Sequence, residues 1–211
     1  VALEAAERAL GDEARAVARS QLHLFPEPWP IVVPSGSCAA MMRHHYAKLF
    51  GGEPALSSKV MAFSERVFEL TEFLVNVVKF DCKDCAESTS VALHTSCHAR
   101  RELGIHESSE KLLRGLAQVS LIEHDRVEEC CGFGGTFAVK HPKISSAITA
   151  DKVESLQSTK ANTVVSADCG CLLNISSAAE YQDRAVHSSS SQRFEHIASF
   201  LWRRTNSGGA A

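Results

Sequence analysis

Apolar positions recur every three or four residues along several stretches of the chain, which is the spacing of amphipathic helices. In the first third, this pattern predicts a helix over residues 2–22, a helical stretch over 38–50 and one long helix over 60–77. A short run of branched apolar residues at 31–33 predicts a buried strand, because the prolines before it disfavour a helix. The glycines and proline at 51–54 are interpreted as a boundary between two segments.

Strand and helix patterns alternate from residue 90 onward. Strands are predicted at 91–94, 119–122 and 163–166, and helices at 99–103, 108–118, 142–159 and 172–181. This alternation predicts an α/β fold, with a parallel sheet flanked by helices and joined by right-handed crossovers. A serine-rich loop is expected at 185–192, followed by a closing amphipathic helix over 194–202.

Each of the three strands predicted in this half leads into a loop that contains cysteine. Cys97 follows the first strand, Cys130 and Cys131 follow the second, and Cys169 and Cys171 follow the third. Because the carboxyl ends of parallel strands meet at one edge of a sheet, we expect these thiols to converge. Cys130 and Cys131 are a poor disulfide pair, since adjacent Cα atoms lie about 3.8 Å apart and disulfides span roughly 4.4–6.8 Å.

The composition is that of a globular protein with many cysteines. The chain has 211 residues, of which 45% are hydrophobic and eight are cysteine, and its formal net charge is −3. This charge and the absence of basic clusters argue against a nucleic-acid binder. No apolar run has the length of a transmembrane segment and no secretory signal is recognised, so a cytoplasmic protein is expected. In a reducing compartment, eight cysteines indicate metal or redox chemistry rather than disulfides.

Convergent thiolates are soft ligands that suit zinc, copper(I) or an iron–sulfur cluster. Five sulfurs exceed the four that a tetrahedral zinc ion uses, and adjacent cysteines suit a centre with several irons, so iron–sulfur is favoured. Three glycines that follow the cysteine pair would let the backbone approach an anionic cluster, or would simply form a tight turn. They are Gly132, Gly134 and Gly135.

Two other functions remain open from the residues alone. One is a zinc-stabilised structural or interaction module, in which the metal is needed for folding. The other is a thiol–disulfide redox protein that uses the CxxC pair Cys82 and Cys85. That pair has the spacing of a zinc or redox site, but a surface loop is the favoured interpretation.

Three separated motifs resemble one known family. They are HTSCH at 94–98, EECCGFGGTF at 128–137 and SADCGCLLNI at 166–175. In this order they resemble the cysteine-rich CCG domain of the lactate-utilisation protein A (LutA) type, which is related to the glycolate oxidase iron–sulfur subunit and to the B-type chain of heterodisulfide reductase. The resemblance covers roughly residues 57–200.

The resemblance implies one complete CCG domain over residues 57–203, preceded by the C-terminal part of another over 1–56 and followed by a disordered tail at 204–211. The segment PSGSCAAM at 34–41 resembles the closing motif of the preceding domain. Because the opening motifs of that domain are missing and the first residue is valine, the chain is expected to be a fragment or an incomplete gene product.

The resemblance also implies a [4Fe–4S] cluster. Its ligands would be four cysteines, with a further ligand from Cys169 or Asp168 and with Cys38 as the remnant of a first cluster site. The four are Cys97, Cys130, Cys131 and Cys171. His94 and His98 would either hydrogen-bond around the cluster or simply pack.

In function, the resemblance implies an electron-transfer subunit that has no catalytic residues of its own. It would relay electrons within a complex that oxidises L-lactate to pyruvate, together with partner iron–sulfur and oxidoreductase subunits. No nucleic-acid partner and no transmembrane segment are expected.

Overall fold

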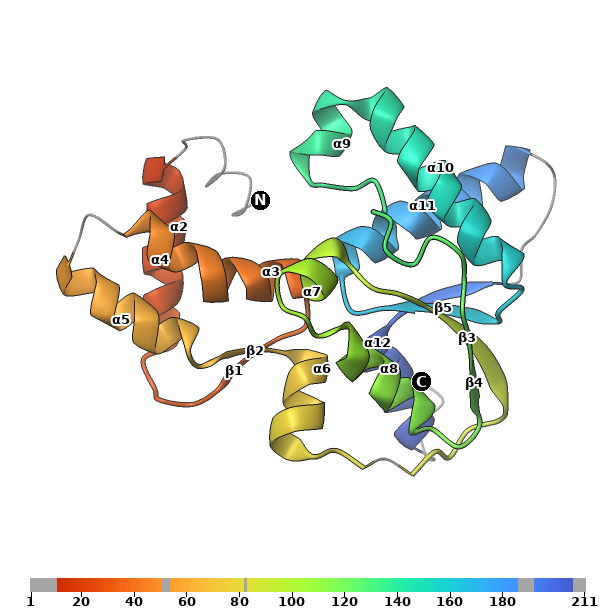
Figure 1. Cartoon of the computed structure of the whole chain (residues 1–211), viewed down its shortest axis with the longest axis horizontal. Helices are drawn as coiled ribbons and strands as arrows, with labels where there is room; N and C mark the ends of the chain where they lie inside the picture. The colour runs from red at the N-terminus through yellow and green to blue at the C-terminus, as the bar shows by residue number, and fades with distance from the viewer. Residues whose placement is uncertain (1–10, 51–53, 82, 186–191, 207–211) are drawn as a thin grey trace.

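The computed structural model describes residues 11–50, 54–81, 83–185 and 192–206. Within them, parallel strands are flanked by helices, which confirms the predicted α/β fold class (Figure 1). A two-stranded sheet pairs β1 (Ile31–Val33) with β2 (Val67–Glu69). A four-stranded sheet has the order β4-β3-β5-β6, with bounds β3 Thr89–His94, β4 Val119–Ile122, β5 Thr163–Ser166 and β6 Arg193–His196.

The order of the larger sheet contains a reversal between β3 and β5. The chain passes from β3 to β4 on one side, then crosses to β5 on the other side and continues outward to β6. All three pairings are parallel, and His94 at the end of β3 lies beside Ser166 at the end of β5. The crossovers leave these two neighbouring strands in opposite directions, which opens a crevice where open α/β sheets bind their ligands.

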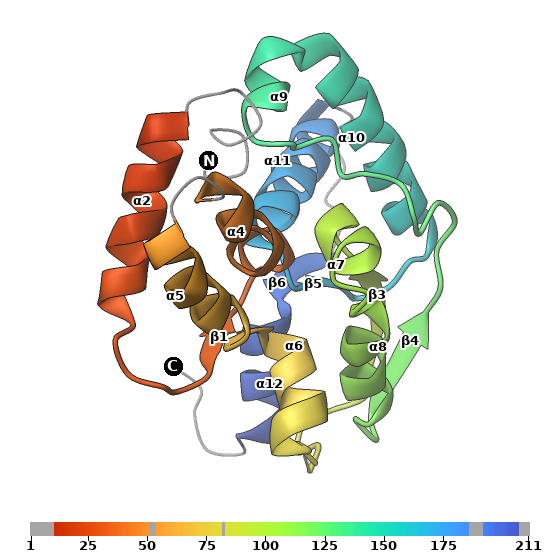
Figure 2. The same cartoon turned by 60° about the vertical axis from the view of Figure 1, so that its left-hand side comes forward.

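Helices cover both faces of this sheet, as Figures 1 and 2 show. One face, with Val91, Leu93 and Val165, packs against α8 and α12. The other, with Ala92 and Val164, packs against α10 and α11. Alternate residues of each strand point to opposite faces, so these strands are apolar throughout. The helices are α7 Cys97–Arg101, α8 His106–Arg114, α9 Thr136–Lys140, α10 Pro142–Ser158, α11 Cys169–Ala185 and α12 Ile197–Thr205.

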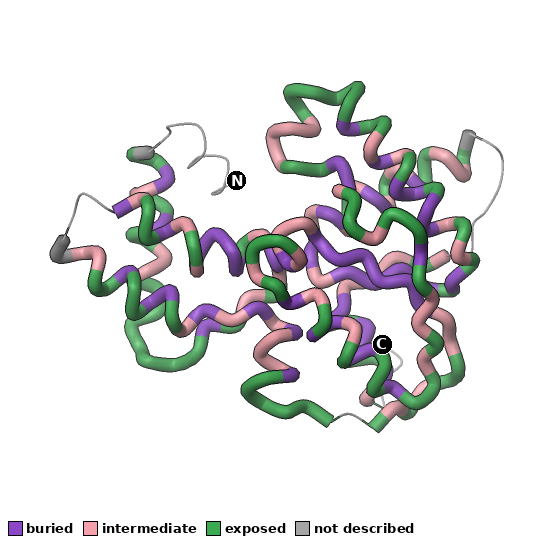
Figure 3. Tube along the Cα trace, viewed as in Figure 1, coloured by how far each residue is buried: buried purple, intermediate pink, exposed green. Residues whose placement is uncertain are grey.

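The amino-terminal part of the chain forms a separate core beside the larger sheet. Its elements are α2 Gly11–Leu24, β1, α3 Gly36–Ala40, the π-helix η1 Met41–His45, α4 Tyr46–Leu49, α5 Pro54–Ser64 and β2. The core includes Ile31, Tyr46 and Phe50, and also Phe63 and Val67. Figure 3 shows this buried stretch apart from that of the larger sheet. Elements α5 and β2 therefore pack with the first core, although most of α5 and all of β2 come after the boundary predicted at residue 56.

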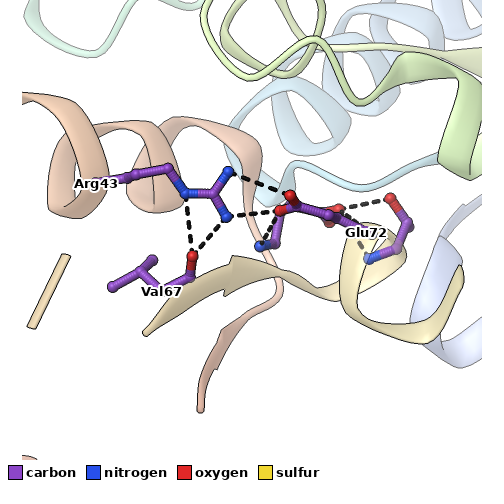
Figure 4. A network of polar contacts seen from close by, with 5 residues as sticks. Arg43, Val67 and Glu72 are labelled. Atoms are coloured by element: carbon purple, nitrogen blue, oxygen red, sulfur yellow. Dashed lines mark hydrogen bonds and ion pairs between the residues drawn. The ribbon is translucent and has the colours of Figure 1, made fainter. Parts of the chain in front are cut away.

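The single helix predicted over residues 60–77 is wrong. Helix α5 ends at Ser64, and β2 follows before α6 (Leu70–Glu72) and the π-helix η2 (Phe73–Val78). The buried carboxylate of Glu69 accepts from the backbone N–H groups of Thr71 (2.8 Å) and Glu72 (3.3 Å), which caps α6. Arg43 donates to the carbonyl of Val67 and to Glu72 (Figure 4). The backbone forms a strand here although the apolar spacing is that of a helix, because the pairing with β1 and this cap decide its local conformation.

The carboxyl-terminal region differs from its prediction at two points. Residues 193–196 form β6, although Phe194 was assigned to a closing helix; pairing with β5 overrides the helical spacing. The helix itself continues to Thr205, past residue 203, where the complete domain was expected to end. Arg204 extends it because its side chain is buried and forms an ion pair with Asp84 (2.6 Å).

Several predicted features fall partly outside the described residues. These are residues 2–10 of the first helix, most of the serine-rich loop, the tail from 207, and Cys82. Cys85 is exposed, and its backbone N–H donates to the carbonyl of Arg204 (2.8 Å). None of the described helices combines the length and the apolar character needed to cross a membrane.

Candidate metal centre

The crevice at the reversal of the sheet holds the cysteine loops. His94 ends β3, and the hydroxyl of Ser96 accepts from the N–H of Ala99 (3.2 Å), which begins α7 with Cys97 in its first turn. Cys171 lies in the first turn of α11, just after β5, and the loop after β4 supplies Cys130 and Cys131. Three crossovers thus bring cysteines to one edge of the sheet, as the strand ends predicted.

Three of these side chains form a compact group of metal-ligating atoms. A ring nitrogen of His94 and the sulfurs of Cys131 and Cys171 all lie within 4.8 Å of one another, and all three residues are buried. The group is made of soft sulfur and imidazole donors, which are the donors that zinc and iron–sulfur centres use.

The other two thiols extend this group. Hydrogen bonds from Cys131 and Cys97, together with the N–H of Gly132 (3.3 Å), lower the pKa of Cys130 to about 2. The same bonds, with burial, raise the pKa of Cys97 and of Cys131, and Cys131 also contacts Cys171. The four sulfurs therefore form a continuous set in which the thiolate charge settles first on Cys130.

The imidazole of His94 meets the conditions for a metal ligand. It is 1% exposed, and neither ring nitrogen has a hydrogen-bond partner among the described residues. Burial lowers the pKa of His94 to about 3, and the positive charge of Lys152 acts in the same direction. A neutral ring with an unpartnered lone pair, next to two sulfurs, fits a metal centre, because buried polar groups normally have partners.

The loop that carries the cysteine pair is tied to two helices. Gly132 has a φ of +84°, and a Cβ there would collide with the hydroxyl of Thr149 and the carbonyl of Ser145. Ser145 donates to the carbonyl of Gly132 (2.8 Å), and the amide of Asn174 donates to the carbonyl of Cys131 (2.8 Å). Gly132 is therefore required for the close approach of this loop to α10. Gly134 and Gly135 also have positive φ values.

Other predicted site residues lie outside the compact group. The Asp168 carboxylate accepts from the backbone N–H of Ser37 (3.1 Å), in the first turn of α3, and from the hydroxyl of Ser35 (3.3 Å), which caps that helix. Cys38 and Cys169 are exposed. Cys169 and Cys171 are two positions apart in a helix with about 100° per residue, so their side chains diverge.

His98 also lies away from the compact group. Its Nε2 is 3.5 Å from Glu102, which pairs on its other side with His45 (2.9 Å). This network of α7 with the first core has no contact to the four sulfurs among the interactions of the described residues. Glu102 therefore joins the two cores, with His98 beside it, and the predicted part of His98 in the cluster environment stays a prediction.

Two buried polar residues beside the centre were missed from the sequence. His124 contacts the hydroxyl of Ser155 (3.0 Å) and the carbonyl of Leu93 (3.2 Å), and Lys152 is 0% exposed. For Lys152 a signal existed: buried positions 145, 149, 152 and 156 follow the spacing of one helix face, and a lysine in such a stripe is unusual. For His124 no comparable pattern exists.

Comparisons with known proteins agree with this geometry. Residues 91–176 match the family model of the CCG cysteine-rich domain. The chain is 41% identical over 165 residues to lactate utilization protein A 2 of Bacillus cereus (strain 03BB102), covering 78% of this chain and 68% of that protein. It is 34% identical over 189 residues to lactate utilization protein A of Geobacillus sp. (strain WCH70), covering 90% of this chain and 76% of that protein.

These matches confirm the resemblance drawn from the three motifs. The matched CCG region spans β3 to α11 and includes every residue of the compact group. With this identity over most of both chains, the protein belongs to the lactate utilization protein A family.

Proposed function

We propose that this chain is an iron–sulfur subunit of a lactate-utilisation system. In this proposal Cys97, Cys130, Cys131 and Cys171 bind a [4Fe–4S] cluster. The observation that carries it is the continuous set of four sulfurs, joined by His94, in the crevice of the sheet. The names of the relatives support the connection to lactate.

The protein's residues would hold and shield the centre rather than transform a substrate. A bound cluster would supply one-electron transfer. The glycine loop, closed onto α10 by Ser145 and Thr149, keeps the sulfurs of the cysteine pair fixed. Burial of Cys131 and Cys171 excludes water from that side. With no catalytic residue assigned, the chain would relay electrons to or from partner iron–sulfur and oxidoreductase subunits that oxidise L-lactate to pyruvate in the cytoplasm.

The proposal includes a divided chain. Residues up to β2 would be the closing part of one CCG-type domain, and the remainder a complete second one. This is supported by a pattern that both parts share. Strand β1 leads through Pro34 and Ser35 to Cys38 in the first turn of α3. In the same way, β5 leads through Asp168 to Cys169 and Cys171 in the first turn of α11. Cys38, Cys169 and Asp168 would then act as metal ligands only when this chain is part of a larger assembly.

Zinc is the second candidate for the centre. The three ligand atoms of His94, Cys131 and Cys171, within 4.8 Å of one another, also suit one tetrahedral ion with Cys130 or Cys97 as the fourth ligand. The iron–sulfur proposal is favoured because Cys130 and Cys131 are adjacent in the chain, which suits a centre with several irons better than a single ion.

The test is anaerobic expression of the whole chain with added iron and sulfur sources. Iron, acid-labile sulfide and zinc are then quantified, and visible and EPR spectra recorded. About four irons and four sulfides per chain are expected, with loss of the cluster in Cys131→Ser but not in Cys85→Ser, which alters an exposed thiol. Stoichiometric zinc without sulfide would sink the iron–sulfur proposal in favour of zinc.

A further inference from the structure

A buried cation without a carboxylate partner lies beside the metal centre. Lys152, on α10, is 0% exposed, and its ammonium donates to the backbone carbonyl of Arg126. Among the described residues, no carboxylate lies within ion-pair distance of this ammonium. A buried charge is costly unless an opposite charge compensates for it, so this position calls for a resident anion.

Lys152 lies close to the centre, because Thr149, one helical turn before it among the buried residues of α10, donates to the carbonyl of Cys131 (3.1 Å). Glu129, Cys97, Cys131 and Cys130 each interact favourably with the ammonium. Glu129 is a weak candidate as counterion, because half of its side chain is exposed and it lies 4.0 Å from Arg126. Cys131 is buried and Cys97 and Cys130 are half-buried, and charges interact more strongly there than at the surface. His94 and His124, whose pKa values are lowered by burial and by the charge of Lys152, provide no negative charge.

We propose that Lys152 is the counter-cation of the cysteine-bound centre: its buried ammonium compensates the thiolates and the electron that the cluster accepts. This inference rests on the proposed function, because the anion in question is a cluster with its thiolate ligands. Lys152 is a positioning residue: its positive charge acts electrostatically on the centre, and Lys152 is not itself a metal ligand.

The charge has a definite effect on electron affinity. Reduction adds one negative charge to the centre, and a nearby ammonium stabilises the reduced form more than the oxidised form. Lys152 therefore raises the reduction potential. It also makes the empty protein less stable than one with an apolar residue at this position, because the ammonium then lacks most of its compensation.

The experiment compares Lys152→Met with Lys152→Arg and with Lys143→Met, which removes an exposed lysine from the same helix. Each full-length variant is reconstituted with cluster, and its potential is determined by mediated redox titration with EPR detection. Thermal unfolding is followed for the empty and the loaded forms.

In Lys152→Met, the ratio of reduced to oxidised cluster at a fixed potential should fall about tenfold, equal to about 59 mV for a one-electron couple. The empty form should be as stable as the wild type or more so, and the gain in unfolding temperature on loading should be smaller. Lys152→Arg should retain the wild-type potential, since it keeps the charge, and Lys143→Met should not differ from the wild type.

Two results would overturn the inference. One is a potential of Lys152→Met equal to that of Lys143→Met. The other is an empty Lys152→Met that is destabilised or unfolded, which would assign Lys152 a packing role. Failure of the wild type to take up any cluster would instead refute the proposed function, so the two failures are distinguishable.

Discussion

The two cores of this molecule use the same local device with different results. In each, a strand ends in a buried ionisable residue and lies beside a strand that leads into a cysteine-bearing helix. In the first core, β2 ends in Glu69 and β1 leads to the exposed Cys38; in the second, β3 ends in His94 and β5 leads to the buried Cys171. Glu69 is engaged in capping α6, whereas His94 has no partner among the described residues.

The difference lies in how many cysteine loops reach the same edge. The described sheet of the first core has two strands, and only one of them leads to a cysteine. The second sheet has a central strand between two neighbours, so loops after β3, β4 and β5 meet. Thiols gather into a set only where several parallel strands end together, and a single cysteine-bearing loop leaves its thiol at the surface.

The largest expected effect separates the two cysteine-bearing helices. Cys131→Ser should remove most of the bound iron, because its sulfur touches both Cys130 and Cys171. Cys38→Ser should retain wild-type iron and sulfide, since its thiol is exposed and outside the compact group. Iron and sulfide assays after anaerobic reconstitution decide; equal losses in both variants would abolish the distinction between the cores.

Acid should weaken the second core of the empty protein through His94. The folded pKa of His94 is lowered to about 3 from 6.5, so below pH 6.5 the unfolded state binds a proton that the folded state does not. The free energy of unfolding should therefore fall with decreasing pH, by up to about 1.4 kcal/mol per pH unit between these values. Denaturant titrations from pH 7 to pH 4 measure this slope, which should become smaller in His94→Leu.

The first core should respond in the opposite sense. Burial raises the pKa of Glu69 from 4.5, so the folded state retains a proton that the unfolded state loses as pH rises above 4.5. Its contribution to the free energy of unfolding therefore falls as pH rises through this window. Glu69→Gln should flatten this dependence. An unchanged slope in the variant would show that Glu69 does not cause it.

Backbone substitution tests how tightly each loop is packed. Gly132→Ala should cost about 1–3 kcal/mol of unfolding free energy, because the residue has a positive φ and a Cβ would meet α10. Gly36→Ala, at the start of α3 in the first core, should cost less, since the nearest neighbour of Gly36 is the Ser96 hydroxyl at 2.8 Å and its φ is not positive. Urea denaturation of the empty proteins gives both values, and the reverse order would contradict this account.

The smallest expected effect concerns the joint between the cores. Asp168→Asn keeps the size of the side chain but weakens its acceptance from Ser37 and Ser35, and should cost about 1 kcal/mol. The cluster content should remain that of the wild type. Loss of iron from this variant would instead make Asp168 a ligand.

Much of the sheet was predictable because its strands are short, apolar and separated by turn residues. The strands at 91–94, 119–122 and 163–166 are present as β3, β4 and β5, and the approach of Cys131 to Cys171 follows from their parallel ends. The orientation of Cys169 did not follow, because it depends on the rotational position at which α11 begins. The strand β2, which interrupts the helix predicted over 60–77, could not be recognised from the sequence. Its three residues continue the apolar spacing of a helix, and the strand forms only by pairing with the distant β1.

The reversal between β3 and β5 also governs when the metal centre can come into existence during synthesis. Cys97 and Cys171 are more than seventy residues apart, with a strand and several helices between them. Long-range pairing of β3 with β5 must precede their meeting, and such pairing is slow compared with local folding. Until α11 has left the ribosome and docked, the earlier cysteines are a partial set of thiols that a growing chain must protect from oxidation.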